Sequence, residues 1–374
     1  MVETIIHIGF GKCGSTALQY SLSNTPILKA NRKKYKNIKY ITIDKNGQLY
    51  SGNNLRERLL FTASRSLSTA SLTYFKGFSD EILNALRVKL SKLSNNNNSL
   101  LVLSCESWVK RADIFRENAI LEKLNMRAQV ICYARNPVEW INSAWWQWGA
   151  WSNQNLDSYI DRMVDKRVSK WSNELEEWRN IVGPENLKVK ILPNDIVEDF
   201  YNMIGVELTS DQDNRANSSL PKEILRFYQQ HRELRKSEHE NQLDFILSRY
   251  LKLDSTFSKA PWVLSEEQVD RILKKTKESN IKLMEFIDPD SRKMNMGDER
   301  WWSKTAFEKK TISPACCKEK CLAYEELDKL LLAAIKGIEK LYIENMQLKK
   351  IIKKGNRKVP FPNKKQVCLP SQEK

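Results

Sequence analysis

Four short apolar runs recur in the first half of the chain, and a polar or glycine-containing turn follows each of them. The runs cover residues 4–8, 100–104, 128–134 and 187–192, and their length and β-branched content predict buried strands. Residues 15–23 and 138–148 have helical character, with Pro137 at the start of the second helix. Strands that alternate with helices predict an α/β fold in which helices flank a parallel β-sheet.

Three loops of chemical interest stand at the carboxyl ends of the predicted strands: residues 9–14, 105–107 and 135–137. Ligands of open parallel sheets bind at the carboxyl ends of the strands. We therefore expect these loops to form one functional site. Residues 215–310 are expected to be mostly helical and irregular.

Apolar residues near the C-terminus follow a heptad spacing. Position a would hold Leu331, Ile338, Asn345 and Ile352, and position d Leu327, Ala334, Leu341 and Leu348. A single Asn at a, with Leu mostly at d, is typical of a parallel two-stranded coiled coil. Further apolar residues at 330, 332, 335 and 351 widen the stripe, which favours packing on the protein's own domain or on a larger bundle. The sequence predicts a long C-terminal helix and leaves open a homodimer through residues 327–352.

The composition indicates that the chain can form a hydrophobic core and that its C-terminal tail is basic. The 374 residues are 41% hydrophobic, which excludes a disordered chain. We expect a main domain at residues 1–310, a C-terminal helical segment at 311–355 and a tail at 356–374. Residues 349–374 hold nine Lys or Arg and one acid, half of the net charge of +16. Such a tail is either simply solvated or binds an anionic partner such as a membrane surface, nucleic acid or a polyanionic glycan.

The sequence has no apolar stretch long enough for a transmembrane helix, and it reaches its first motif too early for a signal peptide. We therefore expect a cytoplasmic protein, with peripheral attachment to a membrane through the tail as an option. The seven cysteines, an odd number, suit a reducing compartment. Cys316, Cys317 and Cys321 form a cluster, but no histidine is nearby, so no zinc site is expected.

The loop Gly9-Phe10-Gly11-Lys12-Cys13-Gly14-Ser15-Thr16 joins the first predicted strand to the first helix. Glycines allow close approach of the backbone to an anion, while N–H groups, the helix N-terminus and hydroxyls supply donors. The loop therefore predicts a phosphate-binding turn. It is not a Walker A motif, because no lysine stands directly before Ser15. The alternative is a tight βα turn that binds nothing.

Arg135 and Ser143 are eight residues apart across the next such junction. Arg135 follows the third predicted strand, and its planar guanidinium suits a phosphate group. Ser143 lies two turns into the following helix and could donate from the same side. The alternative for Arg135 is a capping role or a surface ion pair.

Two of these segments resemble one family. Lys12-Cys13-Gly14-Ser15-Thr16 resembles the Lys-x-Gly-Ser/Thr-Thr signature of sulfotransferases that use 3′-phosphoadenosine 5′-phosphosulfate (PAPS), and the stretch from Arg135 to Ser143 resembles their 3′-phosphate segment. The resemblance covers roughly residues 2–205 and implies a three-layer, P-loop-like sulfotransferase fold, with PAPS as co-substrate and no metal. It implies as PAPS-binding residues Gly11, Lys12, Cys13, Gly14, Ser15, Thr16, Arg135 and Ser143. Residues 297–304 contain a weaker match to a stretch that closes over the 3′-phosphate in some members.

Lys12 and Glu106 are the candidate catalytic residues. Sulfuryl transfer, like phosphoryl transfer, depends on positioning and on stabilising the charge of the leaving oxygen, and Lys12 is placed for that. Glu106 follows the second strand, where carbohydrate sulfotransferases of this family commonly have a glutamate base. The alternative is a solvated or capping glutamate. The resemblance implies a hydroxyl acceptor on a carbohydrate or glycolipid, and we expect at least one tryptophan of residues 140–151 to line its cleft.

Two other functions remain open. One is a P-loop kinase or another nucleotide-binding protein, which the displaced lysine and the lack of a clear Walker B aspartate disfavour. The other is a protein that binds anionic polymers through its basic tail. The sequence contains no motif of a nucleic-acid-binding fold outside the tail, so nucleic acid is not expected as the partner.

Overall fold

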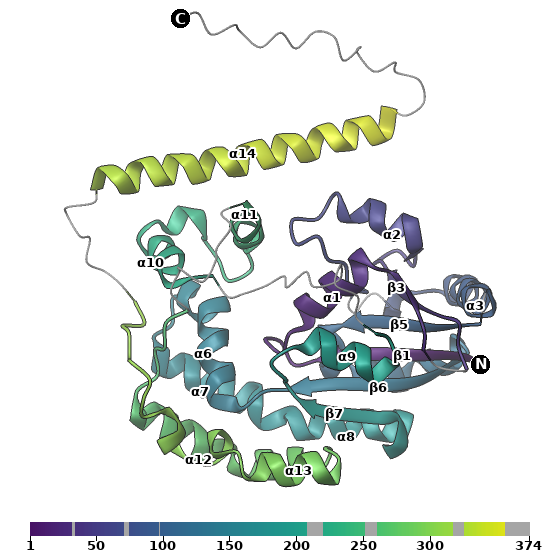
Figure 1. Ribbon diagram of the computed structural model, residues 1–374, viewed down its shortest axis with the longest axis horizontal. Helices are drawn as coiled ribbons and strands as arrows, with labels where there is room; N and C mark the ends of the chain where they lie inside the picture. The colour runs from purple at the N-terminus through teal and green to yellow at the C-terminus, as the bar shows by residue number, and fades with distance from the viewer. Residues whose placement is uncertain are drawn as a thin grey trace, which may run out of the picture. The chain divides into compact units, whose positions relative to one another are not determined.

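The computed structural model describes residues 1–31, 34–70, 75–96, 98–207, 220–250, 260–316 and 325–355. A seven-stranded mixed sheet forms the centre of this part of the chain (Figure 1). Its strands are β1 (Val2–Gly9), β2 (Ile27–Lys29), β3 (Asn37–Ile43), β4 (Leu49–Ser51), β5 (Ser99–Cys105), β6 (Met126–Ala134) and β7 (Leu187–Ile191). The order is β2-β3-β5-β1-β6-β7, with β4 paired to β3. The pairs from β3 to β7 along this order are parallel, and β2 and β4 pair antiparallel with β3.

Helices flank the sheet and continue beyond it. In the first half they are α1 (Ser15–Asn24), α2 (Gly52–Leu59), α3 (Asp80–Asn95), α4 (Ala112–Glu117), α5 (Ile120–Lys123), α6 (Pro137–Gln147), α7 (Leu156–Lys166) and α8 (Trp171–Val182). The later ones are α9 (Ile196–Ile204), α10 (Lys222–Gln230), α11 (Gln242–Tyr250), α12 (Glu266–Met284), α13 (Pro289–Met296) and α14 (Glu325–Gly355). The predicted α/β class, with a mostly parallel central sheet, flanking helices and a long C-terminal helix, is confirmed.

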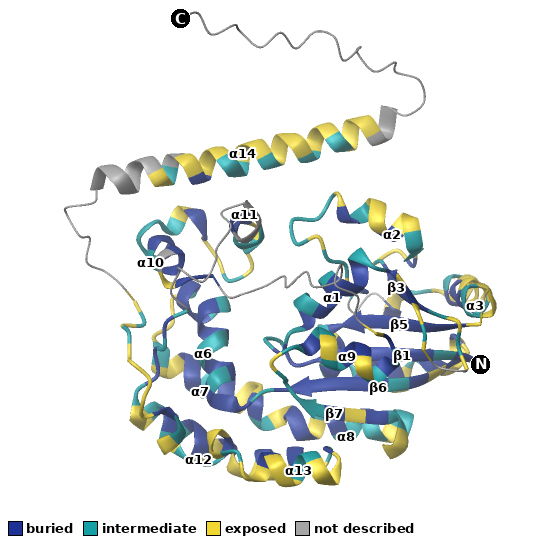
Figure 2. Cartoon of the chain, in the orientation of Figure 1, coloured by how far each residue is buried: buried dark blue, intermediate teal, exposed yellow. Residues whose placement is uncertain are grey.

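The central strands form the core because their apolar side chains are covered on both faces. Every residue of β5 is buried, and so are most residues of β1 and β6 (Figure 2). Helix α1 contacts α9, while α3 contacts β5 and α8 contacts β6. Two-sided coverage explains why these strands appear in the sequence as nearly continuous apolar runs.

The strand register brings the three expected loops to one edge of the sheet. Ile8 of β1 pairs with Cys105 of β5, and Gly9 pairs with Tyr133 of β6. The loop after β1, Glu106 after β5 and Arg135 after β6 therefore all leave the sheet at the same end. A short 3₁₀ helix, η2 (Glu106–Lys110), follows β5 directly.

Local signals in the sequence fix the start of α6. Asn136 caps the helix, because its side-chain oxygen accepts a hydrogen bond from the backbone N–H of Glu139 at 2.9 Å. Pro137 occupies the first helical position, where its fixed φ angle fits and no backbone donor is needed. The cap aligns α6 so that it begins directly beside Arg135.

The chain divides into two compact units, residues 1–323 and 324–374. Of the second unit the structure describes α14, a continuous helix of 31 residues. The predicted basic tail at residues 356–374 lies outside the described residues, as does the boundary region at 317–324. The domain limits expected from the sequence remain predictions.

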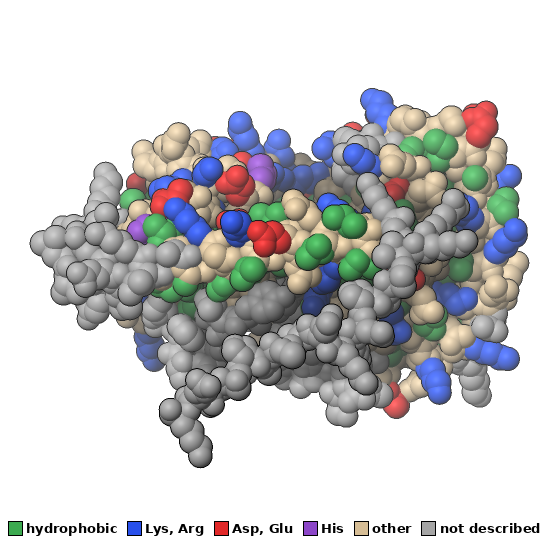
Figure 3. All heavy atoms as spheres, turned by 90° about the horizontal axis from the view of Figure 1, so that it is seen from above, with side chains coloured by type: hydrophobic (Ala, Val, Ile, Leu, Met, Phe, Trp, Pro, Cys, Tyr) green, Lys and Arg blue, Asp and Glu red, His purple; other side chains and the backbone are tan. Residues whose placement is uncertain are grey.

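Basic side chains are spread over the surface. Figure 3 shows Lys and Arg side chains scattered over one face of the chain, with fewer Asp and Glu among them. Within the described ranges, no helix combines the length and the apolar character needed to cross a bilayer.

Candidate functional site

The loop after β1 takes a sharply bent conformation. Lys12 and Gly14 both have positive φ angles, 63° and 80°. A Cβ on Gly14 would lie 2.9 Å from Cδ1 of Ile196, and the positive φ favours glycine, so any other residue would be strained there and would displace the Ile196 side chain. The indole N–H of Trp140 donates to the carbonyl of Gly11 and ties the loop to α6. The bend places Gly14 immediately before the N-terminus of α1.

A cavity of about 440 Å³, the smaller cavity, opens beside this loop. Its lining includes Lys12, Arg135 and Ser143, which the sequence placed at two separate junctions. The other lining residues are Gly14, Ser15, Thr16, Ala17, Glu106, Gln147, Trp148, Leu192, Leu220, Asn241, Asp244 and Phe245. The volume lies within the usual range of small-molecule sites. The cavity therefore combines the anion-binding loop with the Arg–Ser pair in one concave space.

A hydrogen bond to α6 fixes the position of the Lys12 side chain. Its ammonium group donates a hydrogen bond to Oε1 of Gln147 at 3.1 Å. Burial lowers the pKa of Lys12, and the Arg135 charge lowers it further, while Glu106 and Asp244 raise it. A cation that is partly stripped of water interacts strongly with any anion that enters the cavity.

Arg135 lines the same cavity and also forms an ion pair with another residue of the protein. Its side chain is 29% exposed, and Nε lies 3.5 Å from Oε2 of Glu139 one turn into α6. Glu139 also accepts a hydrogen bond from Asn136 and lies 3.9 Å from Arg300. The ion pair between Arg135 and Glu139 is the kind of contact expected if Arg135 had only a structural role, but Arg135 still lines the cavity. Arg300, from the weaker match at 297–304, approaches α6 without lining either cavity.

Some of the remaining loop residues line a cavity, whereas one is buried in the core. Ser15 and Thr16 line the smaller cavity, and Gly11 lines its larger neighbour. Cys13 lines neither cavity, because its side chain is fully buried in the core. Burial raises the pKa of the Cys13 thiol to about 12. Cys13 can therefore serve an anion only through its backbone.

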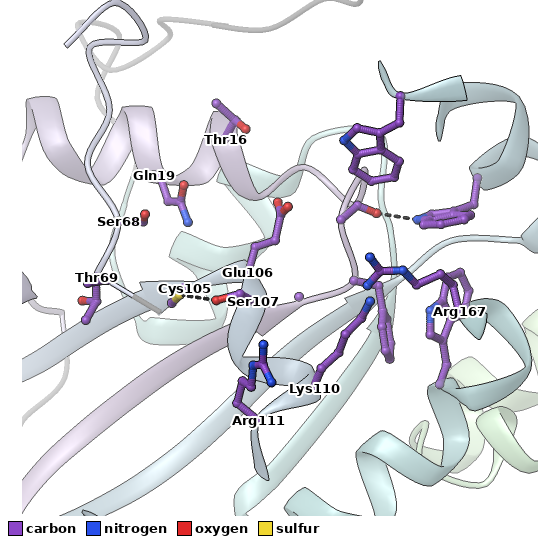
Figure 4. Close-up of a pocket in the computed structure, with 17 residues that line it drawn as sticks. Thr16, Gln19, Ser68, Thr69, Cys105, Glu106, Ser107, Lys110, Arg111 and Arg167 are labelled. Atoms are coloured by element: carbon purple, nitrogen blue, oxygen red, sulfur yellow. Dashed lines mark hydrogen bonds between the residues drawn. The ribbon is translucent and has the colours of Figure 1, made fainter. Parts of the chain in front are cut away.

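A second cavity, the larger one, has a volume of about 620 Å³ and shares Glu106 with the smaller cavity; Figure 4 shows the residues that line it. Four aromatic side chains line it: Phe10, Trp140, Trp148 and Trp171. Phe10 stacks on Trp171 with ring centroids 4.6 Å apart, and Trp140 packs edge-on against Trp171. Three basic residues, Lys110, Arg111 and Arg167, line it as well. Its other lining residues are Gly9, Gly11, Thr16, Gln19, Ser68, Thr69, Ala70, Cys105, Glu106 and Ser107.

Glu106, Thr16 and Trp148 line both cavities and so mark where the two meet. A Cβ on Gly11 would lie 3.2 Å from Oε1 of Glu106 and 3.1 Å from the Trp148 ring, so a side chain there would crowd both residues. Burial raises the pKa of Glu106, while Lys12, the Ser15 hydroxyl and Arg167 lower it. A carboxylate with a raised pKa is a stronger proton acceptor near neutral pH.

None of the three histidines, His7, His231 and His239, lines the smaller or the larger cavity. His7 is fully buried in β1, with Nδ1 2.8 Å from the hydroxyl of Ser104, and burial lowers its pKa to about 3. In the described part of the chain no cluster of His, Cys, Asp and Glu could hold a metal ion.

Sequence reasoning missed several residues of the site. Gln147 lies beyond the Arg–Ser spacing and carries no motif. Asp244 of α11 enters the smaller cavity from a distant segment, where it pairs with the buried Arg235, and burial raises its pKa to about 6. Lys110 and Arg111 could have been noticed four and five residues after Glu106. Arg167 has no sequence signal, because only the fold brings the end of α7 to β5.

No protein-family model and no curated protein matches the chain. Two solved structures are similar to it. The sulfotransferase domain from the Synechococcus PCC 7002 olefin synthase has a TM-score of 0.33 and 13% identity, covering 72% of this chain and 93% of that one. The sulfotransferase domain from the curacin biosynthetic pathway has a TM-score of 0.32 and 12% identity, covering 74% and 98%. The chain is thus similar in structure to domains named as sulfotransferases.

Proposed function

We propose that this protein transfers a sulfuryl group from PAPS to an acceptor hydroxyl. One observation carries the proposal: Lys12, Arg135 and Ser143 line one cavity, and Glu106 joins that cavity to a second one. The first cavity suits an anionic nucleotide, and the second has room for an acceptor. A carboxylate shared by two substrate-sized spaces can accept a proton from an acceptor in one space while a donor occupies the other.

The smaller cavity would hold the donor. The backbone donors of the loop at residues 11–16 and the N-terminus of α1 would bind the 5′-phosphosulfate. Arg135 and Ser143 would bind the 3′-phosphate, because a guanidinium matches the geometry of phosphate oxygens. Gln147 would hold the Lys12 ammonium in place until the donor enters.

The transfer itself is a displacement at sulfur. The acceptor oxygen forms a bond to sulfur while the bond from sulfur to the bridging phosphate oxygen breaks. Glu106 takes the hydroxyl proton, and the bridging oxygen leaves with the negative charge on adenosine 3′,5′-bisphosphate. Lys12 stabilises that charge, which is larger in the transition state than in the bound donor. All atoms and charges are then accounted for without a metal in this step.

The larger cavity would hold the acceptor, which we propose to be a carbohydrate or glycolipid. Trp148, the one of its four aromatic lining residues that is not buried, supports this, because the faces of sugar rings pack well on indole rings. Of the five tryptophans between residues 140 and 151, Trp140 and Trp148 line this cavity, and Trp148 is the only one of the five that is not buried.

Ligand-induced stabilisation tests the proposal against a kinase. Adenosine 3′,5′-bisphosphate in EDTA should raise the Tm of the protein, since a ligand at a hundred times its Kd stabilises by about 2.7 kcal/mol. ATP with Mg²⁺ should raise it less. Radiolabelled PAPS should then transfer sulfate to a screen of glycans and glycolipids. Stabilisation by ATP-Mg²⁺ alone would show that the site is that of a kinase or nucleotidase.

A further inference from the structure

The larger cavity carries a charge pattern that the proposed transfer step does not use. Lys110 and Arg111 come from the end of η2, and Arg167 directly follows α7, so two separate segments supply three cations. Figure 4 shows the Lys110 and Arg167 side chains projecting toward the same part of the cavity. Among the described residues, no ion pair or side-chain hydrogen bond neutralises any of the three.

The carboxylates nearby compensate these cations only in part. Glu106 is the one acidic residue in the lining, and its pKa is raised by burial. Glu174, which also interacts with Arg167, lies outside the lining, and burial raises its pKa to about 7. The three cations therefore outnumber the one carboxylate of the lining. The cavity is a net positive space with an aromatic wall.

The cations are also distinct from those of the donor cavity. Lys12 and Arg135 line only the smaller cavity, and Lys110, Arg111 and Arg167 line only the larger one. A donor bound through Lys12 and Arg135 would leave the second set of cations free for another anion. Arg167 is exposed and the other two are half-buried, so water must leave this region when a ligand enters.

We infer that the acceptor is anionic: it carries a carboxylate, phosphate or sulfate group beside its reacting hydroxyl, and Lys110, Arg111 and Arg167 bind that group. An acidic sugar fits the cavity, because its ring can pack on the partly exposed Trp148 indole and its oxyanion pairs with the cations. The pairing positions the hydroxyl at Glu106. This inference rests on the proposed transfer reaction and specifies its acceptor.

Three p-nitrophenyl glycosides that differ at one carbon test the inference: the β-D-glucoside, its 6-phosphate and the β-D-glucuronide. Their Kd values are measured by calorimetry on the full chain, with and without saturating adenosine 3′,5′-bisphosphate. We expect the phosphate or the glucuronide to bind at least about 10-fold more tightly than the neutral glucoside, the size of one charged hydrogen bond. The stronger of the two identifies the oxyanion. Equal or absent binding of all three at millimolar concentration overturns the inference.

Single variants locate the effect. Lys110→Ala, Arg111→Ala and Arg167→Ala should each remove most of the preference for the anionic glycoside and leave the Kd of the neutral one unchanged. Lys166→Ala removes an exposed charge next to Arg167 that lines neither cavity, and it should keep the preference. All four should bind adenosine 3′,5′-bisphosphate normally. A weakened nucleotide affinity in the three variants would assign the cations to the donor instead, whereas absent nucleotide binding in the wild type would overturn the proposed reaction itself.

Discussion

Lys12 donates a hydrogen bond from its ammonium group to Oε1 of Gln147 at 3.1 Å, and this contact connects the loop after β1 to the last residue of α6. Arg235 donates to the backbone carbonyl of the same Gln147 at 2.8 Å. The helix that carries Ser143 is thus fixed to the loop that carries Lys12. The two proposed anion sites are held at a set distance before any ligand binds.

Loss of either cation should disable the donor cavity. Lys12→Ala and Arg135→Ala should each lower the transfer rate by at least about a hundredfold, the usual cost of one preorganised charge contact. Lys12→Ala should act mainly on kcat and Arg135→Ala mainly on the Kd of adenosine 3′,5′-bisphosphate. Arg127→Ala, which removes an exposed arginine of β6, the strand that Arg135 follows, is the control and should behave as wild type. Near-normal turnover in either folded cavity variant would contradict the donor assignment.

Glu106→Gln should separate binding from transfer. The amide keeps the shape of the carboxylate but cannot accept the hydroxyl proton, so nucleotide affinity should persist while transfer is lost. The measurements are calorimetry with adenosine 3′,5′-bisphosphate and a radiolabelled transfer assay. Glu174→Gln, which changes a half-buried carboxylate that lines neither cavity, should retain transfer. An active Glu106→Gln enzyme would show that the proton goes elsewhere.

The dependence of kcat/KM on pH should be a narrow bell. Burial raises the pKa of Glu106, so its carboxylate, the proposed base, is lost earlier as the pH falls. Burial lowers the pKa of Lys12, so its charge is lost earlier as the pH rises. Asp244, whose pKa is raised to about 6, is the competing source of an acid limb. The Asp244→Asn variant should still lose kcat/KM at low pH, as the wild type does. If that loss disappears in the variant, Asp244 and not Glu106 is the group that titrates.

The backbone at Gly14 should not tolerate a side chain. Gly14→Ala forces an L-residue to a φ of 80° and places its Cβ 2.9 Å from Ile196. The left-handed conformation alone costs about 1–2 kcal/mol, so urea unfolding should show a lower free energy of unfolding and calorimetry a weaker nucleotide affinity. Gly77→Ala is the matched control, because its Cβ would meet nothing within 4 Å. Equal stability of the two variants would argue against a rigid loop.

Much of the site could be predicted because its chemistry stands directly after buried strands. The ends of β1, β5 and β6 are apolar runs followed by Gly9, Glu106 and Arg135, and parallel pairing necessarily brings such ends together. Strand β3 was missed because Lys39 interrupts its apolar run. That lysine is buried within the fold and donates to the carbonyls of Leu93 and Asn96, a partnership that no local pattern indicates.

The C-terminal helix was predicted from spacing alone, but its partner was not. We propose that α14 self-associates as a parallel coiled coil, with Asn345 paired to its copy at an a position. Light scattering should then give a dimer for the full chain and a monomer for a chain that ends at Pro314. Leu341→Glu with Leu348→Glu, which charges two d positions, should also give a monomer. A monomeric full chain at micromolar concentration would show that residues 327–352 do not form this dimer.

The burial of Cys13 has a consequence for how the protein withstands oxidants. A thiol in the middle of a nucleotide loop would ordinarily expose binding to peroxide and alkylating agents, because the thiolate is the reactive form. Here the thiol is enclosed in the core and stays protonated, as does the thiol of Cys132 on the neighbouring strand. Cys316, which is exposed, lies far along the chain from the loop. An oxidant would therefore react with the exposed Cys316 before the buried Cys13, and the Cys13 thiol would not act as a redox switch.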